Sequence, residues 1–142
     1  MLKTETRICV RYAETERMGI VHHSNYAVWF EEARTDFFHQ LGESYAQVEE
    51  AGVFLPLTDL SCSYKRPAVY EQEIIVQTRV VRATCVRLRF AYEVRDAADH
   101  TLIATGRTDH AWTDTHLRPI NLMRRMPEVY ALIEGCIQEE GA

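Results

Sequence analysis

The chain opens with alternating polar and apolar residues, the pattern of a strand with one buried face. Thr6, Ile8, Val10 and Tyr12 alternate with charged or small residues, so we predict a first strand over residues 4–12. Four later segments have strand character: residues 57–65, 73–83, 86–95 and 101–113. The alternation is clearest in 86–95, which ends in the turn-forming residues Asp96 to Asp99.

The spacing changes between the first and second predicted strands. From Tyr26 to Leu41 apolar residues recur every three or four positions, which predicts one face of a helix. Gly42 is suited to end this helix, and Ser24 or Asn25 could cap its start. The apolar stripe consists of Tyr26, Trp29, Phe30, Ala33, Phe37 and Leu41. Weaker helical patterns cover residues 45–51 and 126–137.

The predicted order is one strand, one long helix, four strands in a meander and a short terminal helix, which is an α+β fold. A chain of 142 residues has room for one domain, so we expect residues 1–142 to form a single unit. One long helix covers one face of a five-stranded antiparallel sheet. We therefore expect a homo-oligomer, in which a second copy covers the other face or an edge.

Composition narrows the function. The hydrophobic fraction of 46% and the charged fraction of 26% are typical of globular proteins, and the net charge of −5 favours neither nucleic acid nor an anionic membrane. No apolar run has the length of a signal peptide or membrane span, which predicts a cytoplasmic protein. Without a C-x-x-C pair, Cys9, Cys62, Cys85 and Cys136 are predicted to be small buried thiols in a reducing compartment.

Several kinds of chemistry lack their motifs. The six histidines have no metal-ligand spacing, so no metal site is expected. The glycine-rich loops of dinucleotide and nucleotide sites and the G-x-S-x-G motif of serine hydrolases are absent from the sequence. The unusual segment is residues 12–34.

This segment carries Glu14 and Glu16, then Gly19, then two histidines at the predicted helix start. A helix start presents free N–H groups and partial positive charge, which suit a developing oxyanion. If Gly19 lets the chain double back, a carboxylate can face those donors, as acyl transfer to water requires.

Ordinary structural roles compete with this hypothesis. Glu14 and Glu16 could belong to a solvated loop, with Glu16 paired to Arg17, and Glu31 could pair with Arg34 on the helix surface. Tyr12 and Tyr26 could be core or rim aromatics, and His22 and His23 could be structural or exposed. The adjacent residues Arg124 and Arg125 could simply lie in a solvated turn.

The segment resembles the signature of hotdog-fold acyl-CoA thioesterases of the 4-hydroxybenzoyl-CoA thioesterase and YbgC type. The residues in register are Tyr12, Thr15, Gly19, Val21, His23, Asn25, Tyr26, Glu31 and Arg34. The stretch YKRPAVYEQE also resembles a strand and turn of that family. The resemblance implies a hotdog fold, in which the sheet wraps around the long helix. It also implies dimers joined edge to edge with active sites at the dimer boundary, often paired into tetramers.

The resemblance further implies hydrolysis of an acyl- or aryl-CoA to the free acid and coenzyme A, with no metal or redox cofactor. The family's catalytic carboxylate falls on Glu16, as general base or nucleophile, its oxyanion contact on the backbone N–H of His23, and its active-site tyrosine on Tyr12. Gly19, Asn25 and Tyr26 are the expected substrate-binding residues. Family members usually have Asp where Glu16 stands; the added methylene moves the carboxylate by ~1.5 Å, which a base acting through water tolerates better than direct attack.

The resemblance leaves the substrate open. The thiol carrier could be coenzyme A or acyl-carrier protein, the acyl group could be a chain or an aromatic ring, and Arg82, Arg124 and Arg125 are candidates for the coenzyme A phosphates. Two other functions remain: a hotdog hydratase or dehydratase, whose usual Asp/His motif is not found in this sequence, and a non-catalytic module that binds acyl thioesters.

Overall fold

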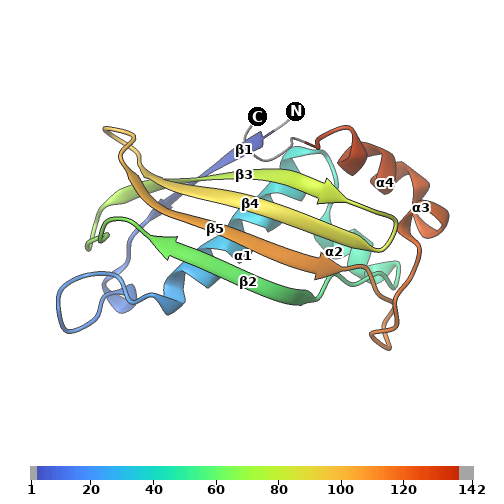
Figure 1. The fold of residues 1–142 in the computed structure, drawn as a ribbon, viewed down its shortest axis with the longest axis horizontal. Coiled ribbons are helices and arrows are strands. Elements are labelled where there is room, and N and C mark those ends of the chain that lie inside the picture. Colours follow the sequence, from blue (N-terminus) through green and yellow to red (C-terminus); the bar gives the residue numbers. More distant parts are fainter. Residues whose placement is uncertain (1–2, 138–142) are drawn as a thin grey trace.

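The computed structural model describes residues 3–137 as one antiparallel sheet wrapped around one long helix (Figure 1). The strands are β1 (Lys3–Cys9), β2 (Leu57–Tyr64), β3 (Glu73–Ala83), β4 (Arg87–Asp96) and β5 (Leu102–Ala111). The helices are α1 (Ser24–Gln40), α2 (Tyr45–Glu50), α3 (Leu122–Arg125) and α4 (Pro127–Glu134), with a short 3₁₀ turn, Tyr12–Glu14. The α+β class, the five-stranded sheet and the hotdog arrangement are confirmed. The terminal helix predicted over residues 126–137 corresponds to α4, and the short helix α3 before it was not predicted.

The strand order corrects one prediction. The order across the sheet is β1-β3-β4-β5-β2, so only β3 to β5 form a meander. β2 pairs with β5 and lies at the edge of the sheet. The connection from β2 to β3 therefore crosses from one edge of the sheet to the other side. It begins with residues 65–67, which lie at the end of the sheet where α1 begins (Figure 1).

The first strand ends earlier than predicted. Thr4, Thr6, Ile8 and Val10 are buried as the alternation requires, but Tyr12 lies in the 3₁₀ turn with 76% of its surface exposed. The reason is local: the Glu14 carboxylate accepts a hydrogen bond from the Arg11 N–H at 2.8 Å, which turns the chain before Tyr12.

Helix α1 confirms the predicted stripe but not the predicted cap. The stripe residues from Tyr26 to Phe37 are buried, and Gly42 ends the helix with a φ of +88°. Ser24 and Asn25 both lie inside the helix: the N-cap residue is His23, whose side chain makes no capping hydrogen bond, and the Asn25 amide donates to the Glu14 carbonyl at 2.9 Å. Asn25 thus ties the preceding loop to the helix.

Aromatic rings fill the space between α1 and the sheet. The Phe30 ring stacks on Tyr92 with centroids 4.4 Å apart and covers Gly106 of β5. A Cβ on Gly106 would lie 2.3 Å from the Phe30 ring, so this position requires glycine. Phe37, Phe38, Phe90 and Trp112 continue the packing in edge-to-face contacts.

The sheet face opposite α1 is polar. It carries ion pairs between Arg89 and Asp109, Arg95 and Glu93, and Arg7 and Glu73. A polar face of an antiparallel sheet is stable against water, so the case for a covering partner rests on the unpaired edge of β2.

Two further expectations meet the structure here. All four cysteines are free, but Cys9 is exposed, Cys62 and Cys85 are partly buried and Cys136 alone is buried, so the prediction of four buried thiols is wrong. Cys9 points outward because it occupies a polar position of the β1 alternation. Within residues 3–137, none of the helices has the length and apolarity needed to span a membrane.

Candidate active site

A tight turn before α1 places Glu16. The Gly19 N–H donates to the Glu16 carbonyl, and the Glu16 N–H donates to the Ile20 carbonyl, both at 2.8 Å. Gly19 has a φ of +84°, which favours glycine. The chain therefore doubles back at Gly19, as predicted, and returns along Val21 to the start of the helix.

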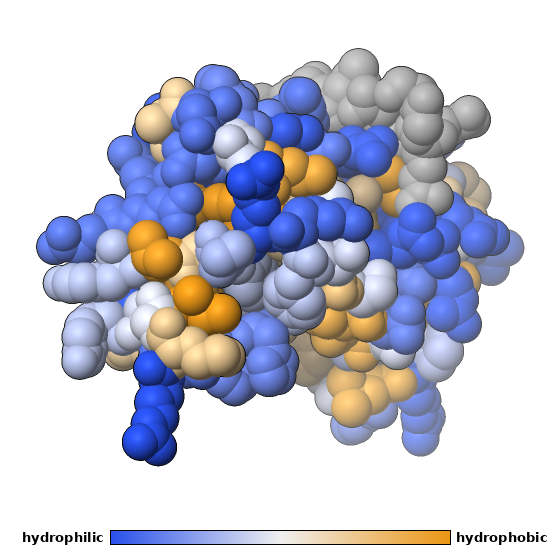
Figure 2. Space-filling model, turned by 60° about the vertical axis from the view of Figure 1, so that its left-hand side comes forward, coloured by the Kyte–Doolittle hydropathy of each residue, from blue (hydrophilic) through white to orange (hydrophobic). Residues whose placement is uncertain are grey.

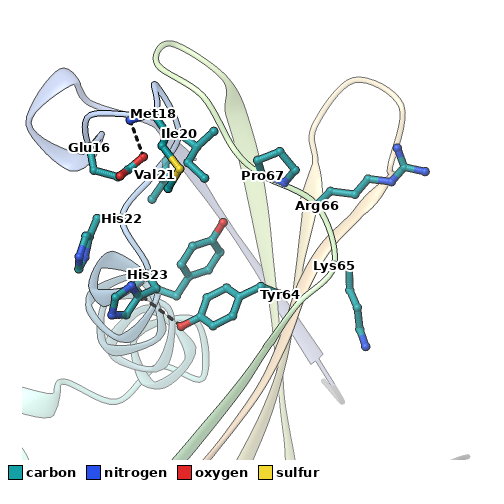
Figure 3. Close-up of a pocket in the computed structure, with 11 residues that line it drawn as sticks. Glu16, Met18, Ile20, Val21, His22, His23, Tyr64, Lys65, Arg66 and Pro67 are labelled. Carbon is teal, nitrogen blue, oxygen red and sulfur yellow. Dashed lines mark hydrogen bonds between the residues drawn. The ribbon is translucent and has the colours of Figure 1, made fainter.

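A cavity of about 560 Å³ lies between this turn, the start of α1 and the end of β2 (Figure 3). Its lining residues are Glu16, Met18, Ile20, Val21, His22, His23, Tyr26, Tyr64, Lys65, Arg66 and Pro67. Of the residues predicted to be catalytic or substrate-binding, Glu16, His23 and Tyr26 line it together. Tyr12, Gly19 and Asn25 lie outside the lining.

Glu16 presents a carboxylate without a cationic partner. One carboxylate oxygen accepts a hydrogen bond from the Met18 N–H at 2.9 Å, which is the single hydrogen bond to this carboxylate within residues 3–137. The suggested ion pair with Arg17 is absent from the four pairs found in that range. Glu16 is therefore held by its own turn and remains available to act as a base.

The start of α1 leaves one N–H group open. The His22 N–H donates to the Glu14 carbonyl at 2.9 Å, and the Ser24 N–H donates to the His22 Nδ1 at 3.2 Å. In the part of the chain that the structure describes, nothing accepts a hydrogen bond from the His23 N–H between them. A helix N-terminus with a free N–H is a ready donor to a developing oxyanion.

The His22 imidazole lines the cavity beside this donor. Its Nδ1 also lies 2.8 Å from the Ser24 Oγ, and its ring stacks on the His23 ring with centroids 4.0 Å apart. Because Nδ1 accepts from a backbone N–H, a neutral His22 carries its proton on Nε2.

Glu14 has a different role from Glu16. It is buried, with 3% of its surface exposed, and its carboxylate accepts hydrogen bonds at 2.8 Å from the Trp29 indole N–H and the Arg11 N–H. The Arg11 guanidinium lies 3.6 Å away. The solvated-loop interpretation is therefore wrong for Glu14, which ties the loop to α1.

Two tyrosines form the inner wall of the cavity. The Tyr26 and Tyr64 rings meet edge to face at 5.0 Å, and the Tyr64 hydroxyl donates to the His23 carbonyl at 3.3 Å. Burial raises the pKa of Tyr26 to about 12, with Cys62 and Tyr64 adding to the shift, and burial also raises the pKa of Tyr64. Both hydroxyls are protonated at neutral pH, so they act as hydrogen-bond donors there.

Two of the aligned positions serve other purposes. The Tyr12 ring packs edge to face on Tyr70 at 5.6 Å, on the outer side of the loop. No ion pair joins Arg34 to Glu31 within residues 3–137, so that expectation is wrong; one guanidinium nitrogen of Arg34 is instead buried.

Exposed apolar residues at this end of the molecule include Met18, Val69 and Tyr70, and Figure 2 shows small apolar groups there within a mostly hydrophilic surface.

The sequence did not single out the wall formed by residues 64–67. The stretch YKRPAVYEQE was noted as a strand and turn, but its place in the cavity depends on β2 pairing with β5. Within residues 3–137, His, Cys, Asp and Glu side chains form no group of three that could hold a metal ion.

The chain is similar in sequence to known proteins. Residues 10–132 match the family described as the thioesterase-like superfamily. A Bacillus subtilis protein provisionally named acyl-CoA thioesterase YneP is 31% identical over 131 residues, which cover 92% of this chain and 95% of that protein.

Solved structures of similar proteins have the same fold. The crystal structure of a DHNA-CoA thioesterase from Staphylococcus aureus superposes with a TM-score of 0.91 at 36% identity and covers 95% of this chain and 91% of that one. A hypothetical protein from Thermus thermophilus superposes with a TM-score of 0.86 at 35% identity, with 96% and 99% covered.

Proposed function

Because the chain belongs to the thioesterase-like superfamily, we propose that it hydrolyses acyl- or aryl-coenzyme A thioesters with Glu16 as its catalytic carboxylate. The observation that carries the proposal is the shared cavity. Within residues 3–137, the Glu16 carboxylate has no ion-pair partner and the His23 N–H has no acceptor, and both residues line the same space. The YneP and DHNA-CoA relatives bear names of the same reaction class.

In the proposed mechanism the thioester carbonyl oxygen accepts a hydrogen bond from the His23 N–H. Glu16 removes a proton from a water molecule, and the water oxygen bonds to the carbonyl carbon. The carbon–sulfur bond of the tetrahedral intermediate then breaks, which releases the carboxylic acid and the coenzyme A thiolate. The proton held by Glu16 returns to the thiolate or to solvent, which restores the carboxylate.

Glu16 acts as a general base in this proposal rather than as a nucleophile. Its carboxylate is held toward its own turn by the Met18 N–H, and a water molecule bridges the remaining distance to the carbonyl carbon. The Tyr26 and Tyr64 rings form the surface for the acyl group, and their aromatic faces suit an aryl acyl group such as the one in the name of the Staphylococcus aureus relative.

We also propose that the working form is a homodimer joined through β2, with tetramers built from such dimers. β2 is an edge strand with exposed apolar side chains, Leu57 at 47%, Leu60 at 37% and Tyr64 at 51%. Such an edge is a template for pairing with a second copy. Sedimentation at micromolar concentration tests this, and a stable monomer would refute it. A cytoplasmic location stays a prediction.

The central test is Glu16→Gln, which keeps the shape of the side chain and removes its basicity. We expect kcat to fall ~10²–10⁴-fold with thioester binding nearly unchanged. The matched control is Glu32→Gln, which changes an exposed glutamate of α1 outside the cavity and should leave turnover unchanged. His23→Ala should retain much of the activity because the proposed contribution of His23 is its backbone N–H.

Release of free thiol, followed with a disulfide dye on a panel of acyl- and aryl-CoAs, separates the competing functions. Hydrolysis releases thiol, hydration releases none, and a binding module shows saturation without product. The binding module gains some support from the Glu16 carboxylate being turned toward Met18. Undiminished thiol release by Glu16→Gln would contradict the carboxylate mechanism.

A further inference from the structure

Two cationic side chains stand at the opposite side of the cavity from Glu16. Lys65 and Arg66 line the cavity together with Pro67, and both extend away from Glu16 (Figure 3). Both residues are exposed. Within residues 3–137, neither side chain forms a hydrogen bond or ion pair with another residue, whereas Arg7 and Arg95 each meet a carboxylate.

The backbone that carries these cations is fixed. The N–H groups of Lys65 and Arg66 both donate to the Ile103 carbonyl, at 2.8 and 3.0 Å. Pro67 follows directly and restricts the backbone further. The two charges are therefore attached to a fixed point of the cavity wall, although their side chains reach into solvent.

The cavity is consequently polarised. A carboxylate lies at one side and two cations at the other, in a protein whose net charge is −5. Such a distribution suits a ligand whose reacting carbon is distant from its anionic groups. A coenzyme A thioester has this form, because the pantetheine arm separates the thioester from the phosphates.

We propose that Lys65 and Arg66 bind the phosphate groups of the coenzyme A portion of the substrate. This rests on the proposed function. Lysine and arginine are the usual phosphate ligands, lysine as a point charge and arginine through paired N–H donors. Two adjacent cations in a cavity wall match a compact nucleotide phosphate better than the broad surface of a carrier protein.

The test compares K65A/R66A with the native chain on two substrates that carry the same acyl group. With acyl-coenzyme A we expect KM to rise about 10-fold and kcat to change by less than about twofold, because the lost contacts lie away from the reacting carbon. With acyl-pantetheine, which lacks phosphates, KM should be the same for both proteins. The rise with acyl-coenzyme A should shrink at high salt, since exposed charges are screened.

The chain offers a matched control in R124A/R125A, because the sequence made this pair a candidate for the phosphates but the structure places it outside the cavity lining. This variant removes another adjacent basic pair, on α3, at the opposite end of the molecule from the cavity (Figure 1). We expect no change in KM for either substrate. Equal changes for acyl-coenzyme A and acyl-pantetheine in K65A/R66A would overturn the proposal, as would an unchanged KM for acyl-coenzyme A. A loss confined to acyl-carrier protein would also overturn it.

A binding measurement keeps this proposal separate from the proposed reaction. Titration calorimetry of free coenzyme A into Glu16→Gln, with and without K65A/R66A, needs no turnover. About 10-fold weaker binding in the triple variant supports the phosphate contacts even if no thioester is hydrolysed. Equal affinity refutes them even if hydrolysis is established.

Discussion

The two ends of the interface between α1 and the sheet differ in one respect. Toward the end of α1, Phe37, Phe38 and Phe90 close the space with ring-to-ring contacts. At its start, Tyr26 and Tyr64 also meet ring to ring, but a cavity remains beside them. The candidate site therefore lies where the aromatic packing stops, at the end of the sheet that the connection from β1 to α1 and the connection from β2 to β3 both reach (Figure 1).

This comparison predicts a separation of effects. Substitutions at the closed end should change the free energy of unfolding and leave the properties of the folded fraction intact. Substitutions of the residues that line the cavity at the open end should change turnover or binding and leave stability nearly intact. The following predictions test that separation, from the largest effect to the smallest.

Gly106→Ala should reduce the free energy of unfolding more than the other substitutions, through the packing between α1 and the sheet. The added Cβ would lie 2.3 Å from the fully buried Phe30 ring, which also stacks on Tyr92 and has little room to move. Overpacking of this kind costs about 3 kcal/mol. Urea denaturation measures the loss, and an unchanged midpoint would show that the packing around Phe30 is looser than described.

Stability should also depend on pH through His110. Burial, followed by the charge of Arg34, lowers the pKa of His110 to about 4. As pH falls from 7 to 5, the unfolded chain binds a proton at this histidine and the folded chain does not, so folding loses about 2 kcal/mol. Denaturation across that range should show the loss, and His110→Gln should remove this part of it. An identical pH profile for the variant would assign the loss to other groups.

Glu14→Gln should separate the two neighbouring glutamates. The amide cannot accept hydrogen bonds at both of its ends, so either the Trp29 indole or the Arg11 N–H loses its partner, at a cost of about 1.5 kcal/mol. kcat of the folded fraction should change by less than about threefold, in contrast to Glu16→Gln. A large loss of kcat without loss of stability would exchange the roles assigned to the two carboxylates.

Tyr12→Phe should have the smallest effect. The Tyr12 ring packs on Tyr70 outside the cavity lining, so removal of its hydroxyl should change kcat/KM by less than about twofold. A loss of tenfold or more would return Tyr12 to the role implied by the family resemblance and would require the loop to rearrange around substrate.

Periodicity predicted the parts of this fold that depend on local spacing. The apolar stripe of α1 and the alternation in β4 specify which side chains are buried, and both are confirmed. The strand order could not be obtained in this way, because the pairing of β2 with β5 depends on contacts far apart in the chain. For the same reason, the sequence did not predict that Lys65 and Arg66 form part of the cavity wall.

The carboxylates show how far a local motif extends. Gly19 and the helix start predicted that a carboxylate would face the start of the helix, and Glu16 and His23 do line the same cavity. The burial of Glu14 was not predicted, because its partner Trp29 belongs to α1 and was noted only as an apolar residue. Cys9 is exposed because it occupies one of the outward-facing positions that alternate along β1. The alternation was visible in the sequence, but cysteine was treated there as a small apolar residue.

Tyr64 belongs to two surfaces at once. It is the last residue of the edge strand β2, and its hydroxyl meets the carbonyl of the residue whose N–H is the proposed oxyanion donor. If copies of the chain pair through β2, the strand end and the donor become better fixed when the pair forms. Turnover per chain should then depend on protein concentration, with a lag or a decline when a concentrated stock is diluted into the assay.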